Sequence, residues 1–268
     1  YKLGYFDKDQ AESRAVAYIS GDEGYINACN SGDLHTTVCR MVWQELPWTG
    51  DLEKDKEIAE RPFYRHFSYR DMAKRGGHGT NYYGTPFTMA KHLKVEVKLM
   101  ENFQRAYFKA FPGIRAWHHK VALALQTKGY LITALGRKRN FLGRRFDDST
   151  LREAIAFEPQ SVVGELLNLF LYRVWRSSLP IQVLAQVHDA ILIQYPQELE
   201  TELVQKVIAL GRTEVPFSCG TMVIPVSAQT GWNWAKYKDS NPYGMKKFKG
   251  DDKRSAPTYG GILDWKVS

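Results

Sequence analysis

The sequence predicts an α+β fold built on an antiparallel sheet, and three observations support this class. Short β-rich runs stand near both ends of the chain, at residues 2–6 and 222–228. Two further runs, 181–187 and 190–195, are separated by only two residues, which predicts a tight β-hairpin. Most of the residues between these runs have helical composition, so strands and helices segregate along the chain as they do in α+β proteins.

A helix is expected directly after the first strand, with Asp9 as its N-cap and Glu12 in its first turn. The predicted helices cover residues 10–18, 33–46, 67–83, 88–128 with a break at Pro112-Gly113, 150–177 and 198–210. Residues 129–141 predict a second hairpin with a basic turn. The chain after Trp234 has the polar, glycine-rich composition of an extended, partly ordered tail.

Charge is distributed unevenly along the 268 residues, whose formal net charge is +8. Residues 61–145 hold 18 basic and 3 acidic side chains, a net of +15, whereas residues 1–60 hold 6 and 12, a net of −6. A basic block beside acidic segments suits a polyanionic partner such as nucleic acid, with carboxylates left to hold divalent metals. The same block is also compatible with a solvated basic surface.

Several classes of protein are excluded by composition. No stretch approaches the roughly 18 uncharged apolar residues that a membrane span needs, so no membrane association is expected. The three cysteines are too few and too scattered for a disulfide framework or a zinc site. No secretion leader opens the chain, which favours a cytoplasmic location, or the host-cell cytoplasm for a viral protein.

Two aspartates stand at the ends of apolar β-runs, where carboxylates are unusual. Asp7 follows the first run and Asp189 lies between the two runs of the predicted hairpin. Carboxylates from two strand ends can meet on one sheet face and hold two Mg²⁺ ions about 3.5–4 Å apart, an arrangement that supports phosphoryl transfer. Two turn aspartates with no shared role are the simpler interpretation of the same positions.

Four residues spaced by four, Arg70, Lys74, His78 and Tyr82, follow one helical stripe. Two permanent cations followed by two aromatic rings suit a nucleoside triphosphate, with phosphates at one end and the base at the other. The glycines at positions 76, 77 and 79 weaken this helix, and we expect them where a substrate or template backbone approaches closely. A basic surface helix, or a glycine loop that cradles phosphate in another way, would share this pattern.

These patterns together resemble family A, the DNA polymerase I-like DNA polymerases, and most of all a bacteriophage-type member. The matching positions are Asp7, Gln10, Glu12 and Arg14 for motif A, Arg70, Lys74, Gly79, Tyr82 or Tyr83, and Gly84 for motif B, and His188 and Asp189 for motif C. Their order and spacing fit over about residues 1–235.

The resemblance implies a role for each matching residue in template-directed DNA synthesis from dNTPs on a primer–template. The catalytic and metal-binding residues would be Asp7 and Asp189, which hold two Mg²⁺ ions with the Lys8 carbonyl as a further ligand, and Lys74, a candidate general acid. The nucleotide-binding residues would be Gln10, the steric gate Glu12, His35, Arg70, Lys74, His78 and the stacking ring of Tyr82. The DNA-binding residues would be Tyr83, Arg152, Gln160 and His188.

Four positions depart from the family pattern. Ala190 replaces the glutamate of motif C, and His78 replaces the usual Phe or Tyr against the sugar. Ala156 stands where many relatives carry an asparagine that meets the template. The closing Tyr-Gly sits one residue later than usual, so Tyr82 and Tyr83 compete for the stacking role.

The resemblance also implies a right-hand polymerase architecture: an antiparallel-sheet palm with a mainly helical fingers subdomain, and no thumb. Residues 1–14 would be palm with the motif A strand, 15–145 fingers, 146–235 palm with the motif C hairpin, and 236–268 a C-terminal tail. Since a family A enzyme needs a thumb to grip duplex, a split or truncated polymerase is expected. A second polypeptide would then supply the thumb and a 3′–5′ exonuclease.

Two other functions remain open from the sequence. A single-subunit RNA polymerase shares this architecture, although Glu12 would obstruct a ribose 2′-hydroxyl. A non-catalytic DNA-binding polymerase subunit would accommodate Ala190 and the missing thumb. Comparing the incorporation of ribonucleotides and deoxyribonucleotides distinguishes an RNA polymerase from a DNA polymerase. Mg²⁺-dependent primer extension distinguishes a DNA polymerase from a non-catalytic subunit.

Overall fold

The computed structural model describes residues 1–144, 146–250 and Arg254, and these residues form two compact units. The first, here called the sheet unit, contains Tyr1–Asp9, Leu166–Thr213 and the described residues from Val223 onward. The second, here called the helical unit, contains Gln10–Glu165 and Glu214–Met222. Each unit has its own cluster of buried apolar side chains, so each is described by itself.

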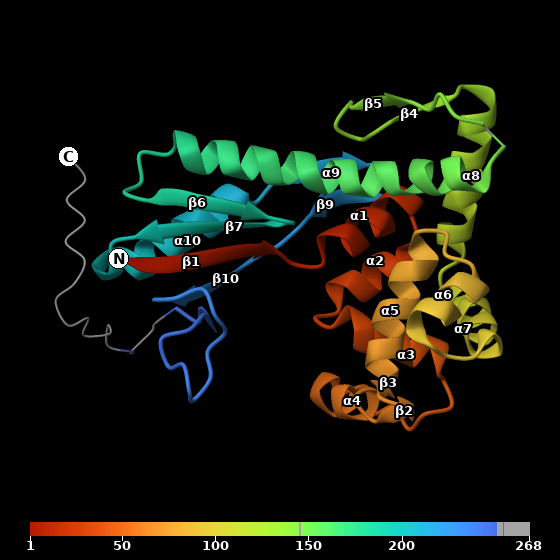
Figure 1. The fold of residues 1–268 in the computed structure, drawn as a ribbon, viewed down its shortest axis with the longest axis horizontal. Coiled ribbons are helices and arrows are strands. Elements are labelled where there is room, and N and C mark those ends of the chain that lie inside the picture. Colours follow the sequence, from red (N-terminus) through yellow and green to blue (C-terminus); the bar gives the residue numbers. More distant parts are fainter. Residues whose placement is uncertain (145, 251–253, 255–268) are drawn as a thin grey trace. The chain divides into compact units, whose positions relative to one another are not determined.

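A five-stranded antiparallel sheet forms the sheet unit (Figure 1). Its strands lie in the order β11 (Lys246–Lys247), β10 (Val226–Gly231), β1 (Lys2–Lys8), β7 (Ala190–Tyr195) and β6 (Gln182–Val187). The predicted α+β class with an antiparallel sheet is therefore confirmed. The predicted hairpin is also confirmed, because β6 and β7 pair directly and only two residues connect them.

The two faces of this sheet differ because alternate residues of β1 point to opposite sides. Phe6 is fully buried, in register with Ile191 of β7, and packs with the second half of α9 (Asp148–Arg176) and with α10 (Glu200–Gly211). Asp7, one residue later, lies on the other face and is only half-buried. The strand therefore places Phe6 in the core and leaves the carboxylate of Asp7 accessible.

The helical unit contains most of the helices drawn in Figure 1. Its helices before α9 are α1 (Ala11–Ser20), α2 (Glu23–Asn30), α3 (Leu34–Val42), α4 (Leu52–Ala59), α5 (Tyr69–Asn81), α6 (Pro86–Leu93), α7 (Val97–Ala110) and α8 (Pro112–Thr127). Three short hairpins accompany them: β2 (Pro62–Tyr64) with β3 (Phe67–Ser68), β4 (Tyr130–Ile132) with β5 (Lys138–Asn140), and β8 (Glu214–Phe217) with β9 (Gly220–Val223). The break predicted at Pro112 and the basic hairpin at 129–141 are confirmed.

Three expectations about elements are wrong. Helix α2 was not expected at all, and the single strand expected at residues 222–228 is divided between β9 and β10, the second of which begins at Val226. Pro225, which cannot donate a ladder hydrogen bond, separates β9 from β10. The N-cap of α1 is Gln10 instead of Asp9, because the Gln10 carbonyl accepts the first helical hydrogen bond, from the Arg14 N–H.

The glycines of α5 serve protein packing, which corrects the expectation that a substrate or template approaches them. A Cβ on Gly76 would lie 2.6 Å from the Phe103 ring, and one on Gly79 would lie 2.4 Å from the Met89 sulfur. The glycines therefore let side chains of α6 and α7 approach the α5 backbone. Their cost to helix propensity is offset by this close contact.

The described part of the tail is tied to the sheet. Strand β11 pairs with β10, and the Arg254 guanidinium donates to the carbonyls of Thr230, Pro242 and Gly244. The remainder of the 236–268 tail lies outside the described residues.

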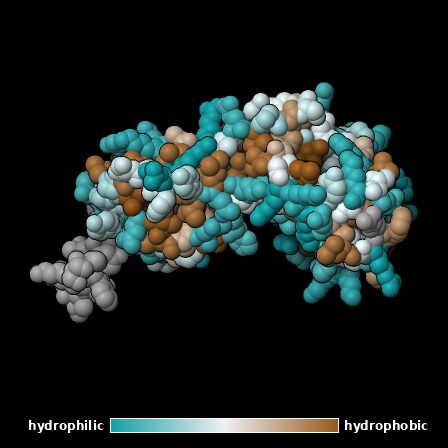
Figure 2. Space-filling model, turned by 90° about the horizontal axis from the view of Figure 1, so that it is seen from above, coloured by the Kyte–Doolittle hydropathy of each residue, from teal (hydrophilic) through white to brown (hydrophobic). Residues whose placement is uncertain are grey.

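Hydrophilic side chains cover much of the face drawn in Figure 2, with hydrophobic patches between them. The most exposed large apolar side chains include Leu142, Phe146 and Trp175. No helix among the described residues is both long and apolar enough to cross a membrane.

Candidate active site

A pair of carboxylates lies on the accessible face of the sheet unit. Asp7, near the end of β1, is in register with Ala190, and the Lys8 N–H donates to the Asp189 carbonyl at 3.2 Å. This pairing places the β6–β7 turn beside the end of β1, where the carboxylates of Asp7 and Asp189 lie close enough for the charge of Asp189 to raise the pKa of Asp7. The structure therefore brings together the two carboxylates that the sequence predicts as a pair.

Electrostatics at this pair favour a bound cation. Burial, the charge of Asp189 and the hydrogen bond with Asp189 raise the pKa of Asp7 to about 7. The pKa of the neighbouring Tyr5 is raised by burial and by the same two carboxylates. Concentrated negative charge on hard oxygen donors fits a divalent ion such as Mg²⁺. No third His, Cys, Asp or Glu completes a metal cluster among the described residues, so backbone carbonyls, water or substrate oxygens would supply the remaining ligands.

Lys8 directs its side chain to the opposite face of the sheet. Its buried Nζ donates to the Gly211 carbonyl at 2.9 Å, and burial together with the charge of Arg173 lowers the pKa of Lys8 to about 8. Only the backbone of Lys8 is thus available to the carboxylate site. Its carbonyl as a metal ligand stays a prediction.

His188 shapes the turn that carries Asp189. Its φ is +53°, in the left-handed region that hairpin turns require and that residues other than glycine adopt at a cost. The unusual His-Asp pair thus still forms a two-residue turn. Its predicted contact with the primer terminus stays a prediction.

Glu12, on α1, is held by side chains of α5 within the helical unit. The Tyr82 hydroxyl donates to Glu12 Oε2 at 2.9 Å, and His78 Nδ1 lies 3.8 Å from the same oxygen. The rings of His78 and Tyr82 pack with centroids 4.9 Å apart. Burial and the Glu12 carboxylate both raise the pKa of Tyr82, so its hydroxyl stays protonated and donates. The three residues form one cluster. The spacing of four predicts that His78 and Tyr82 lie together, whereas their contact with Glu12 was not predicted from the sequence.

Arg70, at the start of α5, is paired with the carboxylate of Asp33. Its Nε and one terminal nitrogen donate to the two oxygens of Asp33 at 3.1 and 3.2 Å. Asp33 also caps α3 by accepting from the His35 and Thr36 N–H groups. Burial opposes ionisation of Asp33, but the hydrogen bonds from Arg70 and Thr36 outweigh it and lower its pKa.

His35 lies near the charges of Asp33, Arg70 and Lys74. Burial, with the charges of Arg70 and Lys74, lowers the pKa of His35 to about 4, although Asp33 opposes this shift. The imidazole is therefore neutral at pH 7 and offers one N–H donor. The structure thus gathers three predicted phosphate ligands, His35, Arg70 and Lys74, around the N-terminal half of α5.

A comparison with family models matches residues 1–236 to DNA polymerase family A. The chain belongs to this family. The family A polymerases that it resembles include DNA polymerase I of Lactococcus lactis subsp. lactis, 26% identical over 245 residues, and thermostable DNA polymerase I of Thermus filiformis, 25% identical over 240 residues. Each match covers 87% of this chain but only 26% and 27% of the relatives, so the chain spans about a quarter of their length.

A solved structure of the family has a similar fold. It is the POL domain of Pol1 from M. smegmatis in complex with DNA primer–template and dNTP, with a TM-score of 0.73 and 24% identity. The match covers 87% of this chain and 40% of that chain. This similarity supports the polymerase fold expected from the motifs.

Tyr82 and Tyr83 have different surroundings in this family A chain. Tyr83 takes φ +62° just past α5, where its N–H donates to Thr80 and the next N–H, of Gly84, donates to Gly79. This is the Schellman geometry that usually places glycine at the position of Tyr83. The Tyr83 ring then packs on the apolar cluster of the helical unit and against His118, whereas Tyr82 is held by Glu12.

The remaining predicted residues lie on α9 and at the start of α1. Arg152 and Gln160 are both exposed, and Gln160 lines a cavity of about 440 Å³ beside the basic residues 137–139. Gln10 has φ +54°, and its Oε1 is buried without a hydrogen-bond partner. A strained residue with an unsatisfied acceptor is typical of a functional position.

Proposed function

We propose that this family A chain provides the catalytic core of a DNA-directed DNA polymerase, with the sheet unit as palm and the helical unit as fingers. The observation that carries the proposal is the pairing of β1 with β7, which brings the carboxylates of Asp7 and Asp189 together at neighbouring strand ends. The ranges expected from the motifs differ from these units at residues 10–14, 146–165 and 214–222, which were expected in the palm and belong to the helical unit. A bacteriophage origin is also part of this proposal, although the reported relatives are bacterial.

The reaction would be attack of a primer 3′-hydroxyl on the α-phosphate of a deoxynucleotide, with release of pyrophosphate. Two divalent ions at Asp7 and Asp189 would activate the hydroxyl and stabilise charge on the transferring phosphoryl group. The two carboxylates position those ions because both are fixed by the β1–β7 pairing.

Residues of the helical unit would bind and select the nucleotide. Arg70 and Lys74 would hold the outer phosphates as cations, and neutral His35 would donate a hydrogen bond to them. Lys74 is the candidate proton donor to pyrophosphate. Glu12, oriented by Tyr82, would exclude a 2′-hydroxyl, and Tyr82 would support the base at the insertion site.

DNA would be held jointly by this chain and by polymerase elements outside it. The coverage of only 40% of the POL-domain chain supports this part of the proposal, in which those elements belong to the same polypeptide or to a second one. Arg152, Gln160 and His188 are the proposed contacts on this chain. A cytoplasmic site of action is part of the same proposal.

Primer extension tests the function. The 268-residue chain, alone and with the rest of the polymerase supplied in trans, is incubated with primer–template, dNTPs and Mg²⁺. We expect extension that Asp7→Asn and Asp189→Asn each abolish while binding of primer–template persists. Extension with unchanged rate in both variants would overturn the proposal. A chain that binds DNA but does not extend the primer, either alone or with the rest of the polymerase, would indicate a non-catalytic subunit instead.

A further inference from the structure

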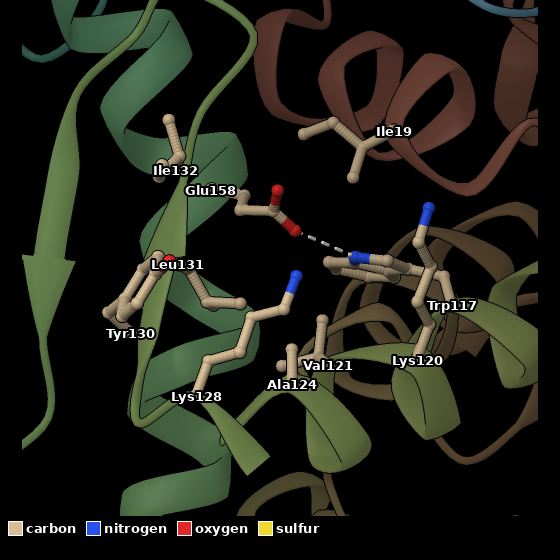
Figure 3. A pocket seen from close by; sticks show the side chains of 10 residues that line it. All are labelled: Ile19, Trp117, Lys120, Val121, Ala124, Lys128, Tyr130, Leu131, Ile132 and Glu158. Carbon is tan, nitrogen blue, oxygen red and sulfur yellow. Dashed lines mark hydrogen bonds between the residues drawn. The ribbon is translucent and has the colours of Figure 1, made fainter. Parts of the chain in front are cut away.

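A second pocket lies in the helical unit and contains none of the residues assigned to polymerisation. It has a volume of about 300 Å³ and lies among α1, α8, β4 and α9 (Figure 3). Its apolar lining is contributed by aliphatic and aromatic side chains: Ile19, Trp117, Val121, Ala124, Tyr130, Leu131 and Ile132. Three charged residues, Lys120, Lys128 and Glu158, complete it.

Glu158 gives the pocket an acceptor in apolar surroundings. Its Oε2 accepts a hydrogen bond from Trp117 Nε1 at 3.1 Å, and Figure 3 shows the carboxylate pointing into the pocket. Burial raises the pKa of Glu158, although the hydrogen bond from Trp117 and the charge of Lys120 oppose the shift. A ligand that donates a hydrogen bond to this carboxylate would relieve the cost of its burial.

Two exposed lysines, Lys120 and Lys128, also line the pocket. In Figure 3 the Lys128 ammonium points toward Glu158 across the pocket, while Lys120 stands beside Trp117. Two cations and one carboxylate leave a net positive charge at the pocket. A cationic side chain of another protein would satisfy Glu158 but would be repelled by both lysines, so an anionic ligand is favoured.

We propose that this pocket binds a nucleoside monophosphate, with the base against Trp117 and the aliphatic lining, an N–H of the base on Glu158, and the phosphate on Lys120 and Lys128. A planar base provides the apolar surface and the donor, and its phosphate provides the anion. The volume accommodates one such unit. The ligand is either a free nucleotide or the 5′-phosphorylated end of a DNA strand, since both present these groups.

The experiment places a reporter in the pocket itself. The full chain is labelled with 5-fluorotryptophan, and the Trp117 fluorine resonance is assigned by its loss in Trp117→Phe. dAMP is titrated without divalent metal, which disfavours binding at the carboxylate pair. We expect a saturable shift of the Trp117 resonance, and Lys128→Ala should weaken the apparent affinity by about tenfold. Lys91→Ala, which removes an exposed lysine elsewhere on the same unit, should leave it unchanged.

Two further comparisons test the contact with the base and the source of the ligand. Glu158→Gln keeps an acceptor for Trp117 Nε1 but loses the charge, so affinity for dAMP should fall while that for deoxyribose 5-phosphate stays constant. A 5′-phosphorylated tetranucleotide distinguishes the sources: a strand-end site binds it about tenfold more tightly than dAMP, and a free-nucleotide site does not.

Three results would overturn the proposal. The first is the absence of a saturable shift at Trp117. The second is a shift that Lys74→Ala removes and Lys128→Ala does not, because the nucleotide would then be bound at α5. The third is a stronger response to a hydrophobic amine such as phenethylamine than to dAMP. Loss of primer extension, which tests the proposed function, does not affect any of these readouts.

Discussion

The Tyr82 hydroxyl donates a hydrogen bond to Glu12 Oε2 at 2.9 Å and thereby joins two helices whose residues are 70 positions apart. Glu12 is the proposed barrier to a ribose 2′-hydroxyl, so its orientation matters as much as its size. His78, 3.8 Å from the same oxygen, is the second group near this carboxylate. In this chain a histidine thus stands beside the gate where relatives are expected to have an apolar ring.

Removing that hydrogen bond should loosen sugar selection. Tyr82→Phe keeps the ring but frees the carboxylate, so ribonucleotide use relative to deoxynucleotide use should rise by about three- to tenfold. Glu12→Ala should raise it further, because the obstruction itself is lost. The ratio of kcat/KM for ATP and dATP in single-nucleotide extension measures both, with Tyr83→Phe as the matched control. An unchanged ratio in Glu12→Ala would place the gate at another residue.

The carboxylate pair should destabilise the metal-free protein at neutral pH. The folded-state pKa of Asp7, about 7, lies above its ordinary value of 3.8, so ionising Asp7 costs folding stability as the pH rises between these values. Asp7→Asn should therefore raise the stability at pH 8 by about 1 kcal/mol after allowance for solvent screening, with no gain at pH 3. Thermal unfolding in chelator measures this, with Glu57→Gln as an exposed control.

Adding Mg²⁺ should reverse that difference. Bound cations would stabilise the wild-type protein by mass action and leave Asp7→Asn nearly unaffected. Equal unfolding temperatures of the two proteins at pH 8, without and with Mg²⁺, would contradict a metal-binding carboxylate pair.

His35 should make folding sensitive to mild acid. Its folded pKa, about 4, lies below its ordinary value of 6.5, so the unfolded state binds a proton first as the pH falls. Stability contributed by neutral His35 is complete above pH 6.5 and is lost between 6.5 and 4, by at most about 3 kcal/mol. Denaturant unfolding from pH 7 to pH 4 should show a shallower loss in His35→Asn. A parallel loss in the two proteins would show that His35 is solvated; exposed His66→Asn is the control.

Because the α5 glycines serve packing, replacing Gly76 by alanine should lower the stability of the protein, whereas the same substitution at Gly164 of α9 should raise it. Gly76→Ala places a Cβ 2.6 Å from the Phe103 ring and should cost about 1–3 kcal/mol of unfolding free energy. Gly164→Ala, in the interior of α9 with nothing within 4 Å of its Cβ, should add about 0.5–1 kcal/mol. Urea unfolding of the two variants gives both values. Stabilisation by Gly76→Ala would mean that the α5–α7 contact is looser than the structure has it.

Local sequence patterns were sufficient to predict most of the fold and the pairing of Asp7 with Asp189. The two-residue gap at 188–189 was sufficient to predict the hairpin, and a spacing of four placed His78 and Tyr82 on one side of α5. The direction of the Lys8 side chain could also be predicted from the sequence. Lys8 follows Asp7 in a strand, so the two side chains must lie on opposite faces of the sheet. These are properties of neighbours in sequence.

What the sequence did not predict depends on residues far apart along the chain. Arg70 meets Asp33 only because α3 packs against α5, and nothing in either local sequence indicates this pairing. Helix α2 has a glycine in its first turn and is stabilised by buried Tyr25, Ala28 and Cys29, so tertiary contacts outweigh its weak local pattern. The α5 glycines were misinterpreted for the same reason, since their partners lie on α6 and α7.

The two-residue connection between β6 and β7 restricts how this region can change in length during evolution. Asp189 reaches Asp7 only while β7 keeps its register with β1, and a strand that slips by one residue turns every side chain to the opposite face. A single-residue deletion at the turn would force β6 or β7 to slip, and a slip of β7 against β1 would move Asp189 away from Asp7. Homologous chains should therefore keep a connection of two residues between these strands.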